Sequence, residues 1–386
     1  MIVYVTTQGS KVIREGRHLL VTCGESVYHT LFPQKLEQLV LCGNVSLTPQ
    51  ALHLLLREGI DTVFLRLDGR YKGRLALEEP KNVFLRRRQF LLSGDDSFCL
   101  AAARNIVSGK LHNAVTVLQR IKRTRQSNGA DHAIAAIRNL SDRISNVADL
   151  TALRGYEGEG AARYFAGLRF GLDDDFGFTR RVRRPPTDPV NAVLSLLYTF
   201  LINRMVAAVR VAGLDPYPGV LHALEYGRQA LPLDLVEEFR APLADTVALA
   251  LFNLRILKQD DFYRQQPVTV ILPQAAVSDP LDALRLDPLG LMSANDDDAD
   301  LFDLPDQALE TPEKEDDSRQ GQAGMRLRPD AFKKVISAFE KKMQTEFVHP
   351  VVGERMTYAD SLIFQARQFR RLIEGETATY QPLLLR

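Results

Sequence analysis

Cysteine is scarce in this chain: only Cys23, Cys42 and Cys99 occur among 386 residues. Their number is odd, and they are scattered without the short spacing of a metal site. This pattern argues against a disulfide framework and against a cysteine-ligated zinc site. It is typical of proteins from a reducing compartment, so we expect a cytoplasmic protein.

We also expect the apolar runs of this chain to be too short to span a membrane. The run Val247–Leu257 is short and is interrupted by Arg255, whereas a helix that spans a membrane needs about 20 apolar residues. The first residues, Met-Ile-Val-Tyr-Val, lack the basic start and the cleavage site of a signal peptide. We therefore expect no membrane partner.

An excess of either charge is absent from the chain as a whole, which has a formal net charge of +1. The charges are unevenly distributed, however. Residues Asp279–Asp317 contain 14 acidic and two basic side chains, a net charge of −12, which leaves about +13 on the remainder. A folded body this basic favours a polyanionic partner such as a nucleic acid, although general solubility would also explain it. We expect residues 273–322 to form an acidic, disordered insertion.

Residues 1–80 have the pattern of a β domain. Short alternating or β-branched runs are separated by Gly, Ser, Asn or Pro. One helix is expected between Ser46 and Gly59, with Ser46 or Thr48 as its cap and Pro49 at its first position. Asp68-Gly69 predicts a hairpin turn.

In residues 81–386 the spacing of apolar residues changes to that of helices. Separate helices are expected at Ser97–Ser108 and Leu111–Gln126. In LRGYEGEGAARYFAGL, Gly155 and Gly158 flank Glu157, which predicts a close backbone approach around this acid before a helix begins at Ala161. In the apolar helix that follows Asp188-Pro189, Asn191, Ser195 and Tyr198 share one face, either as satisfied core groups or as a wall of a site.

The stretch PGVLHALEYGRQALPLDLVEEFRAPLAD, residues 218–245, concentrates polar side chains among apolar ones. Pro232 suits the first turn of a helix. Asp234 and Glu237 are then three residues apart and share a face near its start, with His222 in the preceding loop. These are residue types that bind divalent cations. The simpler explanation is that the two acids complement the helix dipole and that Glu237 pairs with Arg240.

Three passages together resemble the family of CRISPR-associated adaptation integrases ("Cas-one"), which insert new spacers. They are GYEGEGAARYF with Glu157 seven residues before Tyr164, RRPPTDPVNAVLSLLYTFL, and LHALEYGRQALPLDLVEEFRAPLAD with His222 fifteen residues before Glu237. The stretch GNVSLTPQALHLLLREGIDTVFLRLDGRYKGRL resembles the family's amino-terminal domain. Glu238 stands where many relatives have proline, but the spacing from Asp234 places Glu237 on the shared face.

The resemblance implies an α+β fold, with an N-terminal β-sandwich domain for dimerisation (1–80) followed by a larger all-α catalytic domain (81–386). It implies a homodimer that joins a small ferredoxin-like CRISPR adaptation partner. It also implies binding of double-stranded DNA with 3′ ends and its transesterification into CRISPR repeat DNA, with Mn²⁺ or Mg²⁺ as cofactor.

These implications give each candidate residue a role. Glu157, His222 and Glu237 would ligate the metal, which would neutralise the charge that grows on phosphate oxygens during strand transfer. Asp234 would orient these ligands or hold a bound water, and His222 could instead act as a general acid or base. The candidate DNA contacts are Arg163, Tyr164, Arg183, Arg184, Arg228 and Arg240, of which the arginines suit phosphate and Tyr164 could stack on a base. Salt bridges to nearby acids and a buried tyrosine are the alternatives.

Two other functions fit part of the pattern. A structure-selective, metal-dependent DNA nuclease would use the same site without integration. A non-catalytic DNA-binding scaffold would use its acids only to cap helices, and the Glu–His–Glu set argues against this possibility.

Overall fold

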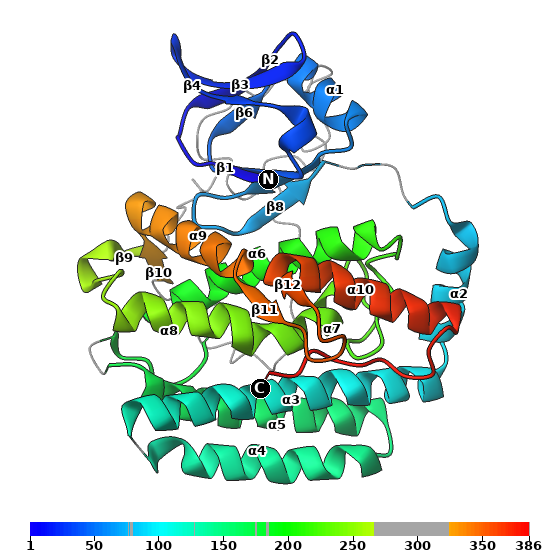
Figure 1. The fold of residues 1–386 in the computed structure, drawn as a ribbon. Coiled ribbons are helices and arrows are strands. Elements are labelled where there is room, and N and C mark those ends of the chain that lie inside the picture. The colour runs from blue at the N-terminus through cyan, green and yellow to red at the C-terminus, as the bar shows by residue number, and fades with distance from the viewer. Residues whose placement is uncertain are drawn as a thin grey trace, which may run out of the picture.

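The computed structural model describes residues 1–75, 77, 80–126, 128–173, 176–182, 185–265 and 324–385 of the chain. N-terminal strands are followed by a mostly helical region (Figure 1). This second part is not all-α, because β9 (Phe262–Gln265) pairs with β10 (Gly324–Leu327) and β11 (Glu346–Val348) pairs with β12 (Arg355–Thr357). The acidic stretch expected at 273–322 lies outside the described residues.

Two four-stranded sheets form the first part. One has the order β1-β5-β7-β8, in which only β8 is antiparallel to its neighbour. The other has the order β4-β3-β2-β6, in which only β6 is parallel to its neighbour. The strand bounds are β1 Ile2–Val5, β2 Ser10–Glu15, β3 His18–Cys23, β4 Ser26–Leu31, β5 Gln38–Cys42, β6 Val45–Leu47, β7 Asp61–Leu65 and β8 Tyr71–Arg74.

Helix α1 (Pro49–Arg57) lies in this part and begins as predicted. The Thr48 side chain accepts a hydrogen bond from the backbone N–H of Ala51, and Pro49 occupies the first turn. The N-terminal cap and the fixed φ of proline both favour a helix start here.

Strand β5 connects the two parts through its two faces. Leu39 and Leu41 belong to a small core that both sheets share with α1. Val40 and Cys42 belong instead to the large core of the helical region. Because successive side chains of a strand point to opposite faces, one central strand serves both cores.

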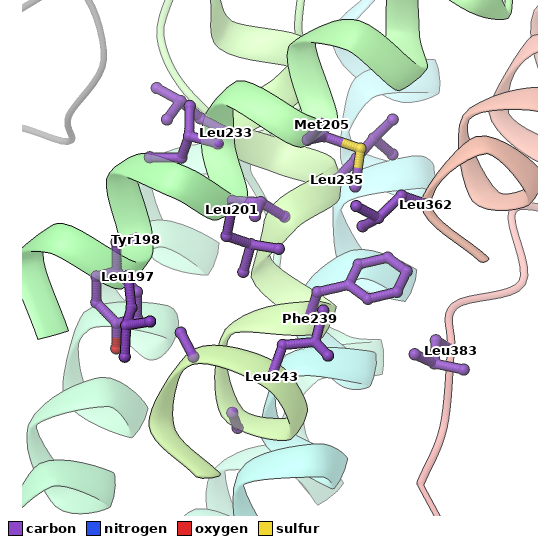
Figure 2. Packing of buried hydrophobic residues seen from close by; sticks show 14 of the residues in the cluster. Leu197, Tyr198, Leu201, Met205, Leu233, Leu235, Phe239, Leu243, Leu362 and Leu383 are labelled. Carbon is purple, nitrogen blue, oxygen red and sulfur yellow. The ribbon is translucent and has the colours of Figure 1, made fainter. Parts of the chain in front are cut away.

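The helical region is built around α6 (Pro189–Val211), which is buried along most of its length. Figure 2 shows Leu201 and Met205 of α6 packed toward side chains of α7 and α10, with Leu383 of the C-terminal segment beyond Phe239. By length and composition α6 could cross a membrane, but 78% of its apolar window is buried inside the protein. Its apolar character is therefore explained by its place in the core. The other helices are α2 Val83–Ser93, α3 Asp96–Arg125, α4 Asp131–Arg143, α5 Leu150–Leu168, α7 Ala230–Phe239, α8 Thr246–Asn253, α9 Pro329–Met343 and α10 Tyr358–Glu374.

Helix α3 is a single helix where two were expected. It continues through Gly109, at which a Cβ atom would come within 2.5 Å of the Pro382 side chain. The glycine therefore permits close approach of the C-terminal segment rather than ending the helix. In Figure 1 that segment runs back from α10 to end beside α3.

Helix α5 also differs from the expectation. It begins at Leu150, where the Asp149 side chain accepts a hydrogen bond from Ala152 N–H, and it continues through the glycine-rich passage. A Cβ atom at Gly160 would lie 2.5 Å from the Leu111 side chain of α3, so this glycine lets α5 pack closely on α3. Glu157 consequently projects from a helix and not from a loop.

Candidate functional site

Asp234 of α7 holds the loop that carries His222. Its Oδ2 accepts hydrogen bonds from the backbone N–H groups of Val220 (2.6 Å) and Leu221 (3.0 Å), and its Oδ1 accepts one from the His222 N–H (2.9 Å). A Cβ atom at Gly219 would lie 2.5 Å from Oδ2, so only glycine allows the loop to wrap this carboxylate so closely. Asp234 thus fixes three consecutive N–H groups of the loop, and Arg154 Nε holds the same loop by donating to the Leu221 carbonyl oxygen at 2.6 Å.

Asp234 also orients the imidazole. The Nδ1 atom of His222 lies 2.6 Å from Asp234 Oδ1, and both side chains are buried. The carboxylate favours the proton on Nδ1, which leaves the lone pair on Nε2 for another partner. A carboxylate in this position can orient a histidine for metal ligation, and the role of Asp234 stays a prediction.

Glu157 and Glu237 meet around one ammonium group. Lys110 projects from α3, Glu157 from α5 and Glu237 from α7. Lys110 Nζ forms an ion pair with Glu157 Oε1 and lies 2.6 Å from Glu237 Oε2. Three helices far apart in sequence therefore bring two carboxylates to one cation.

Charges decide the ionisation state of Glu237, which is almost fully buried. Burial by itself would raise the pKa of Glu237, but the positive charges of Arg240 and Lys110, with a smaller contribution from the nearby His222, outweigh it and lower the pKa to about 2. Arg240 Nη2 lies 3.2 Å from Glu237 Oε1, which is the ion pair considered from the sequence. Glu237 is therefore a carboxylate at neutral pH.

Glu238 faces away from this cluster. Its carboxylate accepts hydrogen bonds from Tyr380 Oη (2.6 Å), Gln365 Nε2 (2.9 Å) and the Leu383 N–H (2.6 Å). Burial raises the pKa of Glu238 to about 7, although these bonds act in the opposite sense. Glu238 anchors the C-terminal segment, and Glu237 is the acid that faces Glu157, as the spacing from Asp234 predicted.

A π-helical turn, Arg240–Asp245, follows α7 and brings a further buried acid into the core. Asp245 accepts hydrogen bonds from Tyr164 Oη (2.9 Å) and Tyr198 Oη (2.7 Å). The Arg240 guanidinium lies 5.0 Å from the centre of the Tyr198 ring. Turns of this type are frequent at functional sites, and this one connects Arg240 to the buried pair of tyrosines.

The shared face of α6 consists of satisfied core groups. Asn191 Oδ1 and Ser195 Oγ accept hydrogen bonds from Arg181 at 3.0 and 2.9 Å, and Arg181 also lies over the Tyr198 ring. These contacts favour the first alternative for the three residues, which was that they are hydrogen-bonded core groups and not a wall of a site.

The candidate DNA contacts fall into different environments. Arg163 is exposed and pairs with Glu159 one turn away. Tyr164 is only 5% exposed and donates to Asp245, and Arg228 is only 1% exposed and pairs with Glu225. Their burial argues against contact with DNA, so the predictions for Tyr164 and Arg228 are corrected to roles in the core.

Three other candidate contacts remain. The Arg240 side chain is mostly buried and forms an ion pair with Glu237. Arg183 and Arg184 lie outside the described residues.

The two carboxylates of the predicted ligand set are placed to bind a divalent cation, but the complete set of three ligands is not assembled in the described part of the chain. Two carboxylates already converge on one cation, and His222 is close enough to lower the pKa of Glu237. Within the described ranges, however, no three His, Cys, Asp or Glu side chains are placed to hold a metal ion together. As the side chains lie, the position between Glu157 and Glu237 is filled by Lys110.

Lys110 is a site residue that was not predicted from the sequence. The signal was a lysine beside Ile106, Val107 and Leu111, all of which are buried apolar residues of α3. Placing a helix break at Gly109 hid it, because Lys110 then fell between two expected elements.

Known proteins resemble the chain along its length. The sequence profile of the family described as "CRISPR associated protein Cas1" matches residues 3–285. A relative named "CRISPR-associated endonuclease Cas1 3", from Thermus thermophilus, is 32% identical over 387 residues, covering 100% of this chain and 97% of its own.

Solved structures share the fold. A "Casposase bound to integration product" superposes with a TM-score of 0.77 at 16% identity and covers 100% of this chain and 94% of its own. A "Cas6-RT-Cas1--Cas2 complex" superposes with a TM-score of 0.76 at 21% identity and covers 99% of this chain and 36% of its own. With the family profile and the relative from Thermus, these likenesses lead to one conclusion: the chain belongs to the CRISPR-associated Cas1 family.

Proposed function

We propose that this protein is a metal-dependent DNA integrase and endonuclease of CRISPR adaptation. It would join the 3′-hydroxyl ends of new spacer DNA to the CRISPR repeat by transesterification. The observation that carries this proposal is the convergence of Glu157 and Glu237 on one cation, beside a histidine that Asp234 orients. The names of relatives as Cas1 endonucleases support the reaction class.

Glu157, Glu237 and Nε2 of His222 would hold Mn²⁺ or Mg²⁺. When bound, such an ion neutralises the charge that develops on the phosphate oxygens. A ligand set with one imidazole suits Mn²⁺ better than Mg²⁺, which prefers oxygen ligands. The low pKa of Glu237 keeps this ligand deprotonated at neutral pH.

The chain's own residues would do the remaining work. Asp234 would keep the His222 ring in one orientation, and the tautomer with Nδ1–H would leave Nε2 free of its proton. Arg240 would balance the charge of Glu237 and hold its carboxylate in place. The exposed Arg163 would contact phosphate, together with Arg183 and Arg184.

The partners follow from the same family membership. The β-containing first part would form a β-sandwich that makes the homodimer, and the core that both sheets share with α1 supports a sandwich. A small ferredoxin-like adaptation partner would bind the dimer, and a structural neighbour belongs to a complex whose title includes Cas2. The substrates would be double-stranded DNA with 3′ ends and CRISPR repeat DNA, in the cytoplasm.

The test is integration of a labelled duplex with free 3′ ends into a supercoiled plasmid. Glu157→Ala and His222→Ala are expected to reduce strand transfer to background and to retain DNA binding in a gel-shift assay. The control is Glu159→Ala, which removes an exposed acid two residues away on the same helix. Full activity of either site variant would remove the proposed site, and activity without a donor 3′-hydroxyl would indicate a plain nuclease.

A further inference from the structure

We propose that the Lys110 ammonium and a divalent cation exchange at one position, between the carboxylates of Glu157 and Glu237. Lys110 would hold the two ligands together before the ion arrives and would leave when it binds. This inference rests on the proposed function, because it concerns the same carboxylates.

The geometry of Lys110 is that of a cation shared by two ligands. Its Nζ contacts one oxygen of Glu157 and, at 2.6 Å, one oxygen of Glu237. The side chain of Lys110 is 15% exposed, so both ion pairs lie largely out of water. Two oxygens from different helices therefore already point at one positive charge.

Repulsion between like charges explains why both cations would not stay. Glu157 and Glu237 carry two negative charges, and Lys110 and Arg240 carry two positive ones. A divalent ion placed between the same two carboxylates would lie next to the ammonium, and like charges this close in a largely buried site repel each other strongly. Departure of the Lys110 ammonium removes this repulsion.

Lys110 is better suited to leave than Arg240. Its ammonium sits at the end of a flexible four-carbon stem. Arg240 starts in the π-helical turn one residue after α7, and its guanidinium lies against the Tyr198 ring. The ring contact and the short distance along the chain keep Arg240 beside Glu237.

Calorimetric titration of the full chain with Mn²⁺ in the absence of DNA tests the exchange. Lys110→Met removes the competing charge and keeps a stem of similar length, and it is expected to bind Mn²⁺ about tenfold more tightly than the unmodified protein. Lys122→Met on the same helix, which removes the pair with Asp131, is the control and should bind like the unmodified protein. Equal or weaker binding by Lys110→Met overturns the exchange.

The same titration separates this inference from the proposed function. If the unmodified protein and Lys110→Met both fail to bind Mn²⁺, the metal site itself is wrong and the exchange fails with it. If both bind with equal affinity, only the exchange fails.

A second measurement uses the unmodified protein and does not depend on a folded variant. Lysine acetylation by an N-hydroxysuccinimide ester, read by mass spectrometry, is compared with Mn²⁺ and with a chelator. Release of the ammonium should raise the modification of Lys110 several-fold in Mn²⁺, with Lys122 unchanged. Unchanged modification of Lys110 at saturating Mn²⁺ overturns the proposal.

Discussion

Two adjacent residues of α7 show opposite ways to bury a carboxylate. Glu237 faces two cations, Lys110 and Arg240, and its pKa is lowered to about 2. Glu238 faces neutral donors from Gln365, Tyr380 and the backbone of the C-terminal segment, and burial raises its pKa to about 7. Both are 2% exposed or less.

The difference shows that burial alone does not indicate a reactive acid. The charged environment keeps Glu237 ionised and able to bind a cation, whereas the neutral one makes Glu238 an anchor for the chain end. One side of α7 thus carries the acid proposed to bind a cation, and the other side carries the acid that packs against the chain end. The experiments below test this division.

The largest contrast is expected between two isosteric variants. Glu237→Gln should abolish strand transfer, because the amide cannot supply a charged ligand, and it should leave Lys110 and Arg240 less well balanced. Glu238→Gln should retain most activity, because among the described residues its carboxylate accepts hydrogen bonds from Gln365 of α10 and from Tyr380 and Leu383, away from the Glu157 cluster. The plasmid-integration assay measures both. An active Glu237→Gln beside an inactive Glu238→Gln would reverse the assignment of the two sides.

A smaller loss of strand transfer is expected from a change at Asp234, which lies one turn before Glu237 on α7. Asp234→Asn should reduce strand transfer about 10- to 100-fold, the usual effect of losing a group that orients a ligand. The amide cannot accept all the hydrogen bonds that the carboxylate receives from Val220, Leu221 and His222.

Asp95→Asn is the matched control for this change. Asp95 caps α3 far along that helix from Lys110, and asparagine caps helices equally well. Equal activity of Asp234→Asn and Asp95→Asn would show that orientation of His222 does not matter.

Loss of a hydrogen bond to Glu238, on the neutral side of α7, should reduce the stability of the protein. Tyr380→Phe removes one of the donors to the buried Glu238 and should lower the free energy of unfolding by about 1–3 kcal/mol. Denaturant unfolding measures this loss. Tyr28→Phe, at a half-exposed position of β4, is the control and should change little. If the two variants are equally stable, Glu238 does not anchor the chain end.

The smallest expected effect is a pH slope. Because the pKa of Glu238 is raised in the folded state, ionisation opposes folding. The unmodified protein should therefore lose stability as the pH rises from about 4.5 toward about 7. Glu238→Gln has no such group, so its thermal midpoint should fall less than that of the unmodified protein between pH 5 and 8. Parallel curves for the two proteins would contradict the neutral environment assigned to this side.

Local signals in the sequence predicted much of the fold. The cap at Thr48 with Pro49, the strands of residues 1–80 and the helices near residues 328–342 and 358–373 depend on short-range patterns. The glycines of α5 indicated a break before Ala161 instead of a continuous helix, because each glycine disfavours a helix by about 1 kcal/mol. Packing against α3, seen at Gly160, outweighs that preference.

The site was only partly accessible from the sequence. The local pattern around Asp234 and Glu237 predicted these two acids and His222 as candidate site residues. The family resemblance added Glu157. Lys110 and the pairing of Asp245 with Tyr164 and Tyr198 depend on contacts between helices distant in sequence, which no spacing rule reports. For the same reason the burial of Tyr164 and Arg228 could not be predicted from their neighbours in the chain.

The central claim is that Glu157, His222 and Glu237 hold one divalent cation. Anomalous diffraction from a crystal soaked in Mn²⁺ tests it most directly. The account predicts one manganese peak within ligand distance of both carboxylates and of His222 Nε2, with the Lys110 ammonium displaced. Lys110 still bridging the two carboxylates at saturating Mn²⁺, with no peak among the three side chains, would contradict it.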